Sequence, residues 1–105
     1  MDHFYQSVEG WMSKQNTVML DKVIELLPQD SVWVELGAWT GRSAAYCVVE
    51  LINKNKFSKF FCVDDWSGGV ELKETDIAKE NSVKTLFLKN IEPVESNITV
   101  IDSLS

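Results

Sequence analysis

The stretch from Val32 to Ser43, which reads VWVELGAWTGRS, most constrains what this chain can fold into. An apolar run that ends in an acid is followed by a turn with two glycines and then by an amphipathic segment. This order of strand, tight turn and helix is typical of doubly wound α/β domains, which bind ligands at the carboxyl ends of their strands. Glycine suits such a turn because it adopts positive φ and lets a ligand approach the backbone closely.

Helical and strand patterns alternate along the rest of the chain. A lead-in over residues 1–16, aromatic between residues 2 and 11, is expected to be helical. After it we expect a helix N-capped by Thr17 and ended by Pro28, a strand over Val32–Leu36, a helix over Gly41–Asn53, a strand over Ser58–Asp64, a helix within Asp76–Ile91 and a strand over Asn97–Ile101. The first strand is almost continuously apolar, which predicts a parallel strand covered on both faces in a three-layer domain.

The predicted fold class is α/β, a partial Rossmann-like doubly wound domain. Its parallel sheet has the order third, second, first strand, and right-handed crossovers connect the strands. In a complete doubly wound domain further strands would lie beside the first one. We therefore expect residues 1–105 to be a truncated domain, with a second copy covering the free edge of the first strand in a two-fold homodimer.

Composition excludes several classes of function. The formal net charge is −6, and the 10 Lys and Arg residues form no cluster that would neutralise phosphates, so no nucleic-acid partner is expected. The N-terminus does not resemble a signal peptide, and no apolar run is long enough to span a bilayer, so no membrane partner is expected either. Cys47 and Cys62 are expected to be buried free thiols of a cytoplasmic protein, and they form no zinc-binding pattern with the single histidine.

A second acid suggests the class of ligand. The apolar run Phe60–Val63 ends in Asp64, about 23 residues after Gly41. A carboxylate at the end of the second strand lies where a ribose presents its hydroxyls, and its two oxygens suit two vicinal hydroxyl groups. The glycine turn and this acid together indicate an adenosyl ligand.

The same residues carry a resemblance to a family. VELGAWTGRS at residues 34–43, followed by VDDW at residues 63–66, resembles class I S-adenosylmethionine-dependent methyltransferases. The similarity is closest to the small-molecule branch typified by macrocin O-methyltransferase and cephalosporin-hydroxylase-like proteins, whose first motif reads E-x-G-x-x-x-G-x-S and whose second strand ends V-D-x-W. FLKNI and ITVIDS near the C-terminus are similar to the branch's third helix and third strand. The resemblance runs from Thr17 to the end, and it covers the N-terminal half of the family's domain.

The resemblance implies a role for each matched residue. Glu35 would contact the methionine amino group, and Asp64 would bind the ribose hydroxyls. Asp102 would reach the adenine edge. The residues implied to line the remainder of the cofactor site are Gly37, Ala38, Trp39, Gly41, Asp65, Trp66 and Ser103. Acidic groups also suit a cationic sulfonium.

Rival ligands fit less well. A nicotinamide dinucleotide needs a glycine where this chain has Trp39, because the pyrophosphate approaches the backbone there. A phosphate loop needs Gly-Lys-Ser/Thr after the turn, and this is missing. Structural roles remain open: Glu35 as a cap of the next helix, Asp64 as a turn residue, and Trp39 and Trp66 as packing residues.

The sequence therefore predicts the S-adenosylmethionine-binding portion of a small-molecule methyltransferase, with O- or N-methyl transfer in the full-length protein. No catalytic residue and no metal site is predicted, because the family's acceptor-binding residues follow the third strand, and we expect the 105-residue chain alone to be inactive. The alternative is a non-catalytic Rossmann-like domain that forms a dimeric interaction protein without cofactor.

Overall fold

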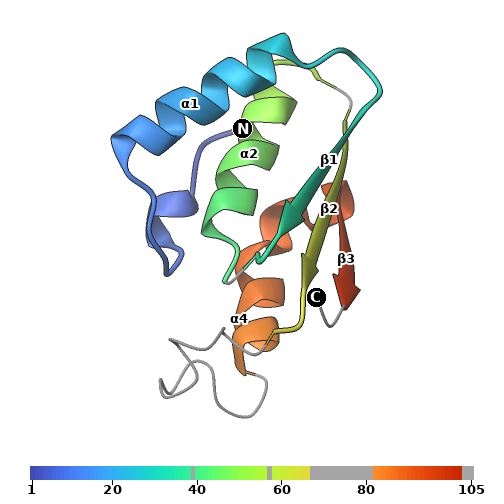
Figure 1. Ribbon diagram of the computed structural model, residues 1–105. Helices are drawn as coiled ribbons and strands as arrows, with labels where there is room; N and C mark the ends of the chain where they lie inside the picture. Colours follow the sequence, from blue (N-terminus) through green and yellow to red (C-terminus); the bar gives the residue numbers. More distant parts are fainter. Residues whose placement is uncertain (39, 57, 67–81, 103–105) are drawn as a thin grey trace.

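Alternating helices and parallel strands make up the chain (Figure 1), whose computed structural model describes residues 1–38, 40–56, 58–66 and 82–102. The elements in chain order are η1 (Tyr5–Ser7), α1 (Lys14–Leu26), β1 (Ser31–Leu36), α2 (Arg42–Asn53), β2 (Ser58–Asp64), α4 (Ser82–Asn90), η3 (Glu92–Asn97) and β3 (Ile98–Asp102). Residues 76–81, where the third helix was expected to begin, lie outside the described residues. The expected alternation of helices and strands is confirmed.

The three strands form one parallel sheet in the order β1-β2-β3. This confirms the predicted α/β class and the predicted order of the strands. Trp33 of β1 lies opposite Phe60 of β2, which lies opposite Ile98 of β3. Because side chains alternate along a strand, every second position from this row faces the same side of the sheet.

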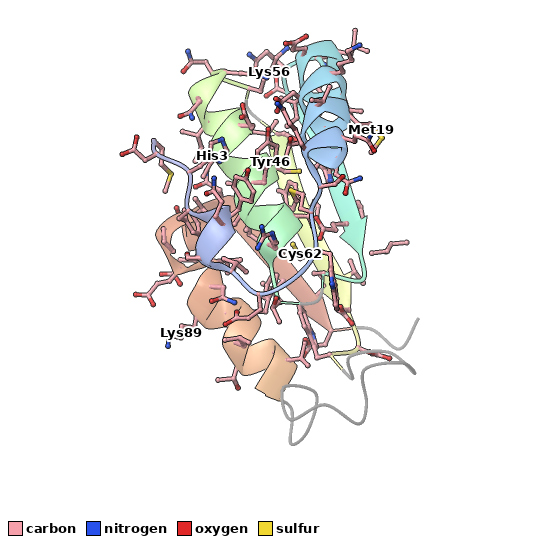
Figure 2. All side chains as sticks on the ribbon, turned by 90° about the vertical axis from the view of Figure 1, so that its left-hand side faces the viewer. His3, Met19, Tyr46, Lys56, Cys62 and Lys89 are labelled. Atoms are coloured by element: carbon pink, nitrogen blue, oxygen red, sulfur yellow. The ribbon has the colours of Figure 1, made fainter. Side chains whose placement is uncertain are left out.

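The α-helices of the described part, α1, α2 and α4, cover that side of the sheet, as Figure 2 shows with the helices in front and the strands behind. Seven residues of α2 are buried, and six of them pack in one core with Phe60 and Cys62 of β2 and with Phe87 of α4. The Trp33 and Phe60 rings stack with their centroids 5.7 Å apart. The sheet and the helical layer therefore share one hydrophobic core.

The expectation that β1 is covered on both faces is wrong. Its side chains alternate between half-buried and exposed, and Val32, Val34 and Leu36 are 59%, 54% and 74% exposed. None of the described helices packs on the face that these three residues occupy, so the described part has two layers instead of three. A continuous apolar run predicts strong burial, but what covers each face depends on segments that pack from elsewhere in the sequence.

The expected start of the first long helix is also wrong. Its N-cap is Ser13, whose Oγ accepts from the Asn16 N–H at 3.1 Å while the Asn16 side chain accepts from the Ser13 N–H at 3.1 Å. This reciprocal pair satisfies two backbone donors, so the helix begins before Thr17. The hydroxyl of Thr17 instead donates to the Lys14 carbonyl at 2.7 Å.

Before α1 begins at Lys14, the lead-in contains only the short turn η1 instead of a full helix, and its aromatic rings pack against α2. His3 stacks on Tyr46 at 4.8 Å, as Figure 2 shows, and Tyr5 meets Tyr46 edge-on at 4.9 Å. The Tyr46 hydroxyl donates to Asp21 of α1 at 2.6 Å, and burial, reinforced by this bond, raises the pKa of Tyr46 above its ordinary value. Tyr46 therefore packs against the lead-in and links α2 to α1.

Two further expectations concern the whole chain. Cys47 and Cys62 are both free and buried, as predicted. None of the helices in the described part of the chain has the length and apolar character that a membrane span requires.

Candidate functional site

Three carboxylates lie at the carboxyl edge of the sheet, each on a different strand. Asp64 ends β2 and is directly opposite Asp102, which ends β3. Glu35 lies one residue before the end of β1, opposite Cys62. All three occupy the alternate positions that face the helices, so parallel pairing brings together acids that lie up to 67 positions apart in the sequence.

The surroundings of Glu35 raise the pKa of its carboxyl group. Ser43, in the first turn of α2, donates its hydroxyl to Glu35 Oε1 at 2.6 Å. Burial raises the pKa of Glu35 to about 7; the bond from Ser43 opposes this shift, and the negative charge of Asp64 adds to it. At neutral pH the group is therefore poised between its neutral and charged forms, and a cationic partner would favour the carboxylate.

The turn between β1 and α2 uses its two glycines differently. Both have positive φ, +77° at Gly37 and +98° at Gly41, as the turn predicted. Gly37 donates its N–H to the Val63 carbonyl at 2.9 Å, and a Cβ placed on it would meet no atom within 4 Å. A Cβ on Gly41 would lie 3.0 Å from both Ile91 and Phe87. Open space for a ligand thus exists beside Gly37, whereas Gly41 admits close packing of α4.

Side-chain hydrogen bonds connect this turn to the lead-in and to the end of α4. The Thr40 hydroxyl donates to the Glu9 carbonyl, and Arg42 Nη1 donates to the Val8 carbonyl at 2.8 Å. Asn90, at the end of α4, donates to the Thr40 carbonyl at 3.0 Å. Thr40 and Arg42 lie within the motif itself, yet their partners are 31 to 50 residues away, so the sequence carried no signal for this role.

Asp64 and Asp102 are connected through Trp66. The Trp66 backbone N–H donates to Asp64 Oδ1 at 3.0 Å, and its indole Nε1–H donates to Asp102 Oδ1 at 2.7 Å. The indole is 4% exposed and packs on Phe87 at 4.8 Å. Trp66 is therefore a core residue that positions both acids, which answers the alternative that the sequence left open for it.

Lys84 of α4 completes this group, and sequence reasoning missed it. Its Nζ donates to Asp102 Oδ2 at 2.7 Å. The bonds from Lys84 and from Trp66 hold the pKa of Asp102 below its ordinary value. A hollow of about 340 Å³ opens here, and its lining residues are Asp65, Trp66, Lys84, Thr85, Leu88 and Asp102. The bond between Lys84 and Asp102 depends on how β3 is placed relative to α4.

The remaining candidates fall into two groups. Ala38 is 3% exposed, so its side chain belongs to the core and only its backbone is left for a ligand. Trp39 and Ser103 lie outside the described residues. Within those residues, no group of three or more His, Cys, Asp or Glu side chains is arranged to hold a metal ion.

No protein-family model matches the chain, and no curated protein is found to be similar to it. The candidate site consists of an acid on each strand, the open backbone at Gly37 after β1, and a hollow beside Asp102.

Proposed function

We propose that the chain binds S-adenosylmethionine, as the cofactor-binding portion of a domain that methylates an oxygen or nitrogen of a small molecule. The observation that carries the proposal is the convergence of Glu35, Asp64 and Asp102 on one edge of a parallel sheet, beside the open backbone at Gly37. Ligands of open α/β sheets bind at this edge.

Each acid suits one part of such a cofactor. Glu35 has its charge disfavoured by burial, so a protonated methionine amino group would be its natural partner. Asp64 ends the strand next to the turn and offers oxygens to the ribose hydroxyls. Asp102 ends β3 beside the hollow, where an exocyclic adenine amino group would donate to it.

The charges of the site also favour a sulfonium compound over a phosphorylated nucleotide. Three carboxylates gather at this edge, and Lys84 is paired with one of them, Asp102. A pyrophosphate placed there would meet carboxylates instead of cations, whereas a cation would be attracted. We assign no catalytic residue.

Calorimetric titration with S-adenosylhomocysteine tests the proposal. We expect saturable binding by the wild-type chain and an affinity about tenfold to a hundredfold lower for Asp64→Ala, since hydrogen bonds to a charged group are the stronger ones. Asp64→Asn keeps an acceptor for the Trp66 N–H, and it should weaken binding as well because the charge is lost.

The matched control is Glu95→Gln, which removes one exposed negative charge from η3, at the opposite edge of the sheet. Its affinity for S-adenosylhomocysteine should equal that of the wild type. A wild-type chain that unfolds cooperatively on heating but gives no heat of binding would contradict the proposal.

A second candidate function is favoured by the exposure of β1. Its residues Val32, Val34 and Leu36 are more than half exposed, and among the described strands β1 pairs only with β2. An open apolar edge strand invites pairing with another chain. A homodimer closed by antiparallel pairing of β1 with its copy would act as an interaction module, with or without cofactor.

Sedimentation velocity tests this second candidate. We expect the wild type to sediment as a dimer and Val34→Lys as a monomer, because a lysine on an edge strand opposes pairing. Leu26→Lys is the control, since Leu26 is 84% exposed and lies on α1, outside the strand. A monomeric wild type, or dissociation in both variants, would exclude pairing at β1.

We propose that the protein acts in the cytoplasm. Both of its cysteines are free and buried, and burial raises the pKa of the Cys47 and Cys62 thiols. Such thiols are unreactive and persist where the compartment is reducing.

A further inference from the structure

The Asp102 carboxylate is already occupied on both oxygens within the chain. Oδ1 accepts from the Trp66 indole N–H and Oδ2 accepts from the Lys84 ammonium, each at 2.7 Å. These are short, charge-assisted hydrogen bonds. Each oxygen keeps a second lone pair, but Lys84 lines the hollow from which a ligand donor would approach Asp102.

The two donors differ in how firmly they are held. Trp66 is buried, packs on Phe87, and has its backbone N–H bonded to Asp64. These contacts fix the position of its indole ring. The Lys84 side chain is 36% exposed and ends a flexible four-carbon stem. The donor in Trp66 is thus held more firmly than the donor in Lys84, and the bond from Lys84 is the one that a ligand can replace.

We propose that Lys84 is a built-in competitor for the ligand: its ammonium holds the Asp102 oxygen that the adenine amino group needs, and binding displaces it. This inference rests on the proposed function of the site. Lys84 also lines the hollow beside Asp102, so its movement frees both an acceptor and space. Residue 84 then sets the affinity of the site by its own attraction to Asp102, without contacting the bound ligand.

The competition is modest in size, because the pair is exposed to water. The Asp102 side chain is 63% exposed, and ion pairs of this kind alter an equilibrium by about twofold to fivefold. Salt screens such pairs, and at about 1 M the screening length is only about 3 Å. The effect of removing Lys84 should therefore shrink as salt is added.

The experiment compares the affinity for S-adenosylhomocysteine of the wild type, Lys84→Met and Lys89→Met by calorimetric titration. Methionine keeps most of the length of the stem and removes the ammonium. Lys89 lies on the same helix and projects outward in Figure 2, so Lys89→Met makes the same change of net charge away from Asp102. We expect Lys84→Met to bind about twofold to fivefold more tightly than the wild type at low salt, with Lys89→Met unchanged.

Equal or weaker binding by Lys84→Met than by the wild type would overturn the proposal and leave the proposed function standing. Absence of binding in all three proteins would overturn both. Tighter binding that persists undiminished at high salt would also count against the competition, because a screened ion pair cannot produce it. Lys84→Gln, which likewise removes the charge, replaces Lys84→Met if thermal unfolding indicates that the methionine variant is not folded.

Discussion

Replacing Glu35 with glutamine is expected to stabilise the folded chain above pH 7 and to flatten the fall in its stability between pH 4.5 and 7. Burial raises the pKa of Glu35 from 4.5 to about 7 in the folded state. Between these values the unfolded chain is ionised while the folded chain still holds the proton. The folded state then binds more protons than the unfolded state, so its free energy of unfolding decreases as pH rises.

The size of the effect follows from the shift in pKa. One pKa unit corresponds to 1.36 kcal/mol, so the loss amounts to roughly 3 kcal/mol, complete above pH 7 and absent below the unfolded pKa. Glutamine is close to glutamate in shape, and its carbonyl oxygen can still accept from the Ser43 hydroxyl. The substitution therefore removes the charge of the half-buried group and keeps the hydrogen bond.

Urea unfolding of the wild type and of Glu35→Gln at a series of pH values between 4 and 8 measures this difference. The control is Glu95→Gln, which removes an exposed acid and should follow the wild-type curve. Wild-type and Glu35→Gln curves that stay parallel across the series would mean that Glu35 is solvated. A bound cofactor with a cationic amino group should reduce the difference in free energy of unfolding between the two proteins, since it would stabilise the Glu35 carboxylate.

Gly41→Ala is expected to destabilise the chain by about 2 to 5 kcal/mol, far more than the same change at Gly37. Both positions have positive φ, which costs a side chain about 1 to 2 kcal/mol. At Gly41 the new Cβ would also lie 3.0 Å from Ile91 and Phe87, which are 1% and 0% exposed, so these side chains would have to shift within a packed core. Overpacking of this kind adds about 1 to 3 kcal/mol.

Thermal and urea unfolding of the two variants provide the comparison, and each serves as the control of the other. Gly37→Ala meets open space, so only the backbone strain of about 1 to 2 kcal/mol should appear. If the two variants lose equal stability, the close approach of α4 to the turn is not a feature of the folded protein. In titrations with S-adenosylhomocysteine the order should reverse among molecules that remain folded, because the proposed ligand approaches the backbone at Gly37.

Much of the fold follows from local signals. Continuous apolar runs ended by an acid mark β1 and β2, and the spacing of apolar residues marks α2 between them. Parallel pairing then requires the ends of the strands to meet at one edge, so the nearness of Asp64 to Asp102 is implied by the topology alone. The positive φ of Gly37 and Gly41 also follows from the turn.

The roles of individual site residues depend on distant partners. Gly41 packs against Phe87 and Ile91, which lie 46 and 50 positions later in the chain. Lys84 of α4 bonds to Asp102 of β3, which lies 18 positions later. The exposure of one face of β1 and the raised pKa of Glu35 likewise depend on which segments pack nearby. No periodicity in the sequence encodes these contacts.

The sequence by itself thus determined the alternation of helices and strands, the order of the sheet and the edge at which the acids gather, because these follow from short-range patterns and from chain connectivity. Only the tertiary structure decided which acid is buried, that Trp66 is a core residue and that Lys84 occupies Asp102. Burial, solvation and pairing of charges depend on three-dimensional packing between segments that are remote in the chain.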